Sequence, residues 1–80
     1  MKTAVVVGKV WATKRVPEVP AGALLQVRLD GSQEELVVLD PLGCGEGERV
    51  LICQGDMVAR WIGSARPMLD ALVIGVVDGE

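Results

Sequence analysis

The sequence predicts an all-β fold, a small five-stranded barrel with one short helix between its fourth and fifth strands. Two observations lead to this class. Five short aliphatic runs are separated by turns rich in glycine, proline and aspartate. Between the fourth and fifth runs, one segment instead has apolar residues at helical spacing. We expect residues 1–80 to form a single domain, because a chain of this size builds one small core.

The first predicted strand covers residues 3–13. Its even positions form a small-aliphatic face suited to the inside of a tight barrel: Ala4, Val6, Gly8, Val10 and Ala12. Its odd positions form a mixed face: Val5, Val7, Lys9, Trp11 and Thr13. Glycine within a strand is typical of a bulge or bend, so we expect one at Gly8.

The next two strands are predicted to form a hairpin. Residues 23–29 alternate, with Leu25, Val27 and Leu29 facing inward and polar residues facing outward. The turn signal Asp30-Gly31-Ser32 follows, and residues 35–39 return antiparallel with apolar side chains on both faces.

Residues 49–54 form the fourth predicted strand, which Gly55 ends. Asp56 is the expected N-cap of a short helix over residues 57–62, and Gly63 stops that helix. Two pairs at i,i+4 spacing, Met57/Trp61 and Val58/Ile62, can lie against the end of the barrel.

The fifth strand, within residues 69–78, is apolar on both faces, with Asp70 and Asp78 bracketing it. Both faces must therefore meet a dry surface. Half of the 80 residues are hydrophobic, and the mean hydropathy is +0.39. So much apolar surface is hard to bury within one short chain, and we expect a neighbouring subunit to cover part of it.

Composition argues against several functional classes. The net charge is −3 and the eight lysines and arginines are scattered, a pattern that does not favour a nucleic-acid partner. The apolar runs are too short to span a membrane, and the N-terminus does not resemble a signal peptide. Cys44 and Cys53 lack metal-ligand spacing, and histidine is absent. We therefore expect a cytoplasmic protein with reduced thiols and no metal.

The loop over residues 40–48 has glycines at every second position, Gly43, Gly45 and Gly47. It lacks the strand-to-helix pattern and the lysine of a phosphate-binding loop, and its glutamates would repel phosphate. Cys44 as a nucleophile would need a base that the sequence does not identify. We expect no catalytic residues and no cofactor, and the chain is interpreted as a structural part rather than an enzyme.

The sequence resembles the pentameric vertex proteins of bacterial microcompartment shells, the EutN/CcmL family. The resemblance covers essentially the whole chain. It is carried by the opening Val6-Val7-Gly8-Lys9-Val10 with Thr13-Lys14, by Asp40, Gly43-Cys44-Gly45, Gly47-Glu48 and Val50-Leu51, and by Gly55, Ala59-Arg60, Pro67, Asp70 and Ile74-Gly75-Val76-Val77-Asp78. It departs at Cys44, where the family often has alanine, and at the short Asp30-Gly31-Ser32 hairpin.

The resemblance implies an OB-like barrel that assembles into a homopentamer. That pentamer would cap the vertices of a shell tiled by hexameric shell proteins, because hexagons alone tile a flat sheet. A heterologous interface whose rotation closes forms such a ring. The alternative is an OB-fold module that binds single-stranded nucleic acid, which would need stacking aromatics and a positive groove.

Candidate site residues follow from this interpretation. The candidates for the subunit interface are Val5, Val7, Trp11, Asp40, Arg60, Asp70, Val73 and Val77. Arg60 could pair with Asp40 or Asp70 across the interface, or it could be a solvated residue at the helix end. The two aspartates could also simply cap turns. The candidates for lining an axial pore are Thr13, Lys14, Gly43, Cys44 and Gly45, although the glycines also suit a plain loop and a pore could be open or closed.

Overall fold

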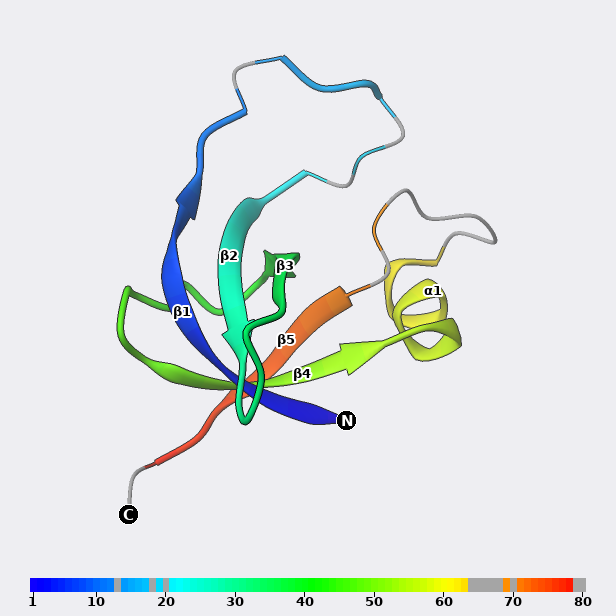
Figure 1. Ribbon diagram of the computed structural model, residues 1–80. Helices are drawn as coiled ribbons and strands as arrows, with labels where there is room; N and C mark the ends of the chain where they lie inside the picture. The colour runs from blue at the N-terminus through cyan, green and yellow to red at the C-terminus, as the bar shows by residue number, and fades with distance from the viewer. Residues whose placement is uncertain (13, 18, 20, 64–68, 70, 79–80) are drawn as a thin grey trace.

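The computed structural model shows a closed β-barrel with one helix (Figure 1). It describes residues 1–12, 14–17, 19, 21–63, 69 and 71–78. The elements are β1 (Lys2–Val10), β2 (Ala23–Leu29), β3 (Glu35–Asp40), β4 (Arg49–Gln54), α1 (Asp56–Ile62) and β5 (Ala71–Val76). The five-stranded barrel and the helix between the fourth and fifth strands are confirmed.

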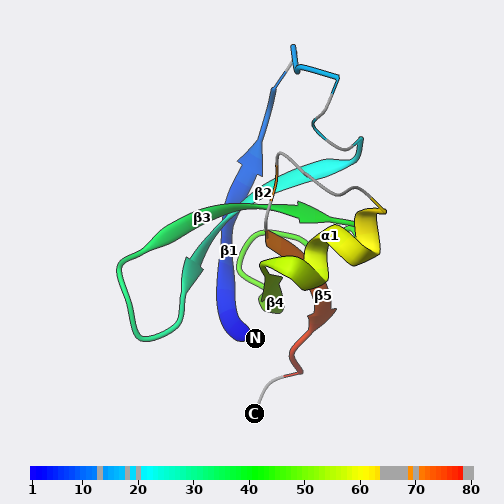
Figure 2. The same ribbon diagram turned by 90° about the vertical axis from the view of Figure 1, so that its right-hand side faces the viewer.

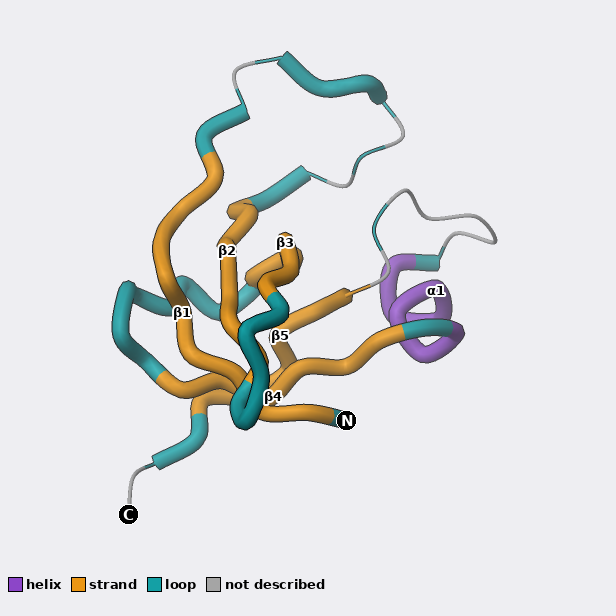
Figure 3. Tube along the Cα trace, viewed as in Figure 1, coloured by secondary structure: helices purple, strands orange, loops and turns teal. Residues whose placement is uncertain are grey.

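The strands close in the order β1-β2-β3-β5-β4, and Figure 3 shows them in orange, with the one helix in purple. The pairing is antiparallel except between β3 and β5, which run parallel where Leu39 lies opposite Leu72. The predicted hairpin is confirmed, with Val27 opposite Leu36 in β2 and β3. A closed barrel presents walls to its surroundings rather than an open sheet edge.

The core has two parts. The first fills the barrel, and its buried members are Ala4, Val6, Leu25, Val27, Leu29, Val38, Cys44, Val50, Ile52, Ala71 and Val73. The second lies where α1 meets the barrel, and its buried members are Leu24, Leu39, Cys53, Val58 and Leu72. Figure 2 shows α1 packed beside the strands, with the chain of β4 leading directly into it. The helix thus supplies a second dry surface within one chain.

The predicted inner face of the first strand is correct only as far as Val6. The register shifts between Val6, which lies opposite Val27, and Gly8, which lies opposite Gln26. The bulge expected at Gly8 is therefore confirmed. Because a bulge adds one residue, the faces exchange beyond it. Val10 consequently packs against the second core rather than inside the barrel, and Ala12 is exposed.

The helix begins differently from the prediction. Gly55, with a φ of 80°, occupies the N-cap position, and Asp56 is the first helical residue without a side-chain capping bond. The carboxylate of Asp56 still lies in the first turn, where the helix dipole favours negative charge. The predicted stop is confirmed, because Gly63 adopts a left-handed φ of 82° and its N–H donates to the carbonyl of Ala59.

The fifth strand is buried on both faces only in its first half. Ala71, Leu72 and Val73 are buried between the barrel interior and the surface beneath α1. This half needs no neighbouring subunit, which corrects the expectation for it. In the second half, Ile74 is 38% and Val76 is 45% exposed, so apolar surface remains uncovered there.

Candidate assembly surface

Asp40 is a buried carboxylate that organises the glycine-rich loop. Its Oδ1 accepts the N–H of Leu42 at 2.9 Å, and its Oδ2 accepts the N–H of Cys44 at 2.7 Å. Only 4% of Asp40 is exposed, and both of its oxygens bind the loop that follows it. This position does not support the predicted pairing of Asp40 with Arg60, because the carboxylate is used within its own subunit.

The rest of the loop is fastened to β1. The N–H of Gly45 donates to Oε1 of Glu48 at 2.6 Å, and the N–H of Gly47 donates to the carbonyl of Val6 at 2.9 Å. Val6 in turn donates its N–H to the carbonyl of Glu48 at 2.9 Å. Gly43 and Gly47 both have left-handed φ values, which explains glycine at these positions. The loop therefore has a defined shape.

The side chain of Cys44 enters the barrel core rather than solvent. Burial is the main cause that raises the pKa of its thiol to about 11, and the charge of nearby Asp40 adds to it. Such a thiol stays protonated and is a poor nucleophile. Cys44 therefore cannot line a pore with its side chain. The other pore candidates Lys14, Gly43 and Gly45 are exposed, and Thr13 lies outside the described residues.

The interface candidates fall into three groups. Val5, Val7 and Val77 are half-buried, and Trp11 and Arg60 are exposed. Val73 is fully buried inside its own barrel, which leaves it no surface for a neighbouring subunit. Asp70 lies outside the described residues.

Trp11 lies beyond the end of β1 and is 82% exposed. The ammonium of Lys9 lies 5.7 Å from the centre of its ring, which is within the range of a cation–π contact. Beside the indole is an open hollow of about 280 Å³, lined by residues from the two ends of the β1–β2 connection. So exposed an aromatic ring is typical of a contact surface.

Asp30 connects three strands at the other end of β1. Its Oδ2 accepts the hydroxyl of Thr3 at 2.6 Å and the guanidinium of Arg49 at 2.5 Å. The hydrogen bond from Thr3 is the largest cause that lowers the pKa of Asp30, followed by the bond from Arg49. Sequence analysis missed this cluster, because its members are far apart in the chain and only the hairpin signal marks Asp30.

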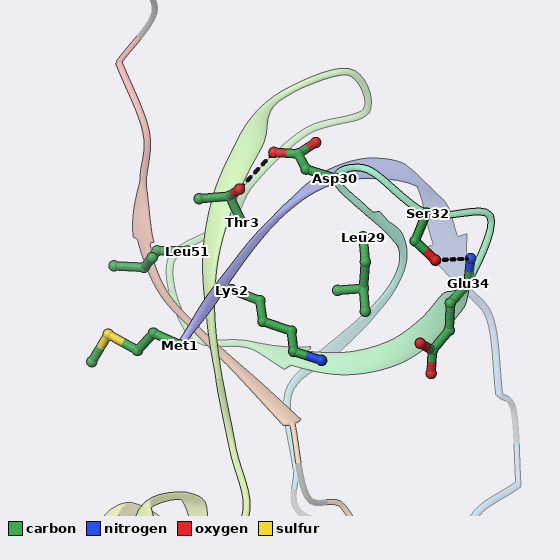
Figure 4. Close-up of a pocket in the computed structure, with 8 residues that line it drawn as sticks. All are labelled: Met1, Lys2, Thr3, Leu29, Asp30, Ser32, Glu34 and Leu51. Atoms are coloured by element: carbon green, nitrogen blue, oxygen red, sulfur yellow. Dashed lines mark hydrogen bonds between the residues drawn. The ribbon is translucent and has the colours of Figure 1, made fainter.

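Figure 4 shows the Thr3–Asp30 bond at the rim of a hollow of about 670 Å³. Lys2, Leu29 and Glu34 also border this hollow. No group of three or more metal-binding side chains occurs among the described residues. No helix in that part of the chain is long and apolar enough to cross a membrane.

Comparison with known proteins settles the family. Residues 1–78 match the family model described as ethanolamine utilisation protein EutN/carboxysome. The chain belongs to the EutN/CcmL family. The resemblance noted from the glycine loop and the closing Ile74–Asp78 stretch is thereby confirmed.

Individual EutN/CcmL relatives agree with this assignment. The carboxysome shell vertex protein CcmL of Synechocystis is 34% identical over 83 residues, covering 98% of this chain and 83% of CcmL. A pentameric shell protein of the RMM microcompartment has 44% identity and a TM-score of 0.87, covering 98% of this chain and 91% of that one. The GrpN pentameric microcompartment shell protein of Rhodospirillum rubrum has 34% identity and a TM-score of 0.78, covering 99% and 95%.

These relatives are components of microcompartment or carboxysome shells. The EutN/CcmL family consists of structural shell proteins rather than enzymes, so the match confirms the interpretation of this chain as a shell protein without catalytic activity. The comparisons give no support to the alternative of a nucleic-acid-binding module.

Proposed function

We propose that this chain forms a homopentamer that caps the vertices of a bacterial microcompartment shell. The observation that carries the proposal is the similarity to a pentameric shell protein, at 44% identity and a TM-score of 0.87 over 98% of the chain. Under this proposal, residues 1–80 form one shell-vertex domain. The assembled protein would lie in the cytoplasm, as part of the shell.

The surface of one subunit suits such a ring. Large apolar side chains are exposed on several elements of the described chain: Met1, Trp11, Val16, Val37, Leu42, Met57, Trp61, Ile74 and Val76. In a cyclic ring each subunit uses two different faces. One face contacts the neighbour on one side, and the second face contacts the neighbour on the other side. Several separate apolar areas on one barrel meet this requirement.

We keep Val5, Val7, Trp11, Arg60 and Val77 as interface residues, because each has accessible surface. Asp70 remains a candidate from the sequence alone. Lys14, Gly43 and Gly45, together with Thr13, remain the candidates for the axial opening, and Asp40 and Cys44 would shape that opening only by holding the loop.

The partners proposed for the pentamer are hexameric shell proteins. Hexamers alone form flat sheets or tubes, and pentamers at the corners allow a sheet to close. Co-expression of this chain with a hexameric shell protein should therefore yield closed polyhedral particles in electron micrographs. Hexamers expressed alone should yield open sheets or tubes. Equal closure with and without this chain would contradict the vertex role.

A further inference from the structure

Gly75 has no evident reason to be glycine within its own subunit. It lies inside β5, opposite Leu51 of β4. Glycine weakens a strand, because it loses more conformational freedom on folding and offers no side chain to pack. Glycine at such a position therefore needs a structural reason that outweighs this cost in stability.

The backbone does not supply that reason. The φ of Gly75 lies outside the left-handed region, so a residue with a side chain could adopt the same conformation. The register of β5 shifts at Ile74, but the type of bulge that requires glycine places it at a positive φ. Packing does not supply it either, because a Cβ built at Gly75 would meet no atom of the described residues within 4 Å.

Gly75 lies in an apolar wall formed by β1, β4 and β5. Thr3 is opposite Leu51 and Leu51 is opposite Gly75, so these three residues form one row across the outside of the barrel. Val5 lies two residues after Thr3, and Val77 lies two residues after Gly75, so both extend the same face. All five residues are half-buried in the single subunit. In Figure 4, Leu51 points away from Leu29, which belongs to the barrel interior.

This wall is poor in free charge. Its one charged member is Arg49, which lies opposite Val5, and the Arg49 guanidinium is held by Asp30 of the same subunit. The outer wall of β2 and β3 exposes Val37 but also Gln26, Arg28 and Glu35, and Arg28 lies opposite Val5 at the border between the two walls. Depletion of charge is characteristic of the centre of a protein interface, and polar residues are characteristic of solvated walls.

We propose that the backbone of a neighbouring copy of this chain packs directly on Gly75, so that the β1–β4–β5 wall is one of the two faces of the ring contact. This inference rests on the proposed pentamer. A second copy is the occupant because the wall is apolar and a ring subunit must offer two faces. A nucleic acid would need free cations, which this wall does not present among its described residues.

The test adds side chains at Gly75. Gly75→Ala and Gly75→Val suit the subunit, because no atom of the described residues lies within 4 Å of the added Cβ, and valine also favours strands. The subunit should keep its far-UV circular dichroism spectrum and its cooperative unfolding. The ring should dissociate at protein concentrations at least tenfold higher for Gly75→Val than for the unchanged chain, with Gly75→Ala between the two.

Gly8→Ala and Gly8→Val are the matched controls. Gly8 also has a φ outside the left-handed region and no atom of the described residues within 4 Å of a built Cβ, but it lies opposite Gln26 of β2, beyond the part of β1 that pairs with β4. Both control variants should keep the ring. Intact rings in both Gly75 variants, or equal dissociation of the Gly8 and Gly75 variants, would overturn the inference. A wild-type chain that forms no ring would instead overturn the proposed function.

Discussion

The carboxylate of Asp40 holds the backbone N–H of Cys44 at 2.7 Å, and both residues are buried. This bond fixes the glycine loop to the barrel. Asp40 binds the loop backbone, and the Cys44 side chain packs in the barrel core. A loop that looks flexible in the sequence is thereby fixed at its base.

Asp40→Ala should destabilise the folded subunit by about 1–3 kcal/mol, because it leaves the N–H groups of Leu42 and Cys44 without their acceptor. Asp40→Asn should cost less, since the amide oxygen can still accept one of the two bonds. The urea midpoint of unfolding measures both. Equal midpoints for Asp40→Ala and the unchanged chain would show that the loop does not depend on this carboxylate.

Cys44 should make the protein less stable in alkali. Its folded-state pKa is about 11, above the ordinary value of 9.0, so folding favours the protonated thiol. The stabilisation is fully present below pH 9 and is lost as the pH rises from 9 to 11. The free energy of unfolding should therefore fall across this window, and it should fall less steeply in Cys44→Ala. Cys53 is retained in both proteins and cancels in the comparison. Parallel curves would contradict the assignment.

Asp30 should make the protein less stable in acid. Its folded-state pKa is lowered from 3.8, first by the hydrogen bond from Thr3 and then by Arg49. The stabilisation is present above pH 3.8 and is lost as the pH falls below that value. Thr3→Val, which removes the hydroxyl but keeps the shape, should reduce the loss of unfolding free energy in this range. An unchanged acid profile in Thr3→Val would contradict the leading role of that bond.

Local signals were sufficient for several elements of the fold. The second and fourth strands have the predicted limits, and Gly63 ends the helix as expected. Alternation of apolar and polar residues identified Leu25, Val27 and Leu29 as buried residues of β2, whereas the burial of Leu24 depends on the core beside α1.

Other features depend on tertiary contacts and could not be predicted from local patterns. The bulge at Gly8 was expected, but its effect on the inner face emerges only from the pairing with β2. Val73 was predicted as an interface residue but faces the barrel interior, because a strand that is apolar at every position does not indicate which of its faces points inward. For Asp40 the sequence left open an ion pair with Arg60 and the capping of a turn, and the structure shows the capping.

Trp11 should become less exposed to water when the ring forms. It is 82% exposed in the subunit, so its fluorescence maximum should lie at a shorter wavelength in the ring than in the dissociated chain. Trp61→Phe leaves Trp11 as the only tryptophan and isolates its signal. Identical maxima at high and low protein concentration, while the mass changes, would remove Trp11 from the interface.

Arg60→Ala should weaken the ring about tenfold, or ~1.4 kcal/mol, if the guanidinium bonds to a neighbouring subunit. Size-exclusion chromatography over a dilution series measures the change. Glu35→Ala is the control, because Glu35 is also charged and exposed but lies in β3, which pairs with neither β1 nor β4. Indistinguishable dilution profiles for the two variants would assign Arg60 to solvent.

Native mass spectrometry of the purified chain at micromolar concentration tests the central claim most directly. The account predicts one dominant species containing five copies of the 8.5 kDa subunit. A well-folded single subunit as the dominant species at that concentration would contradict it.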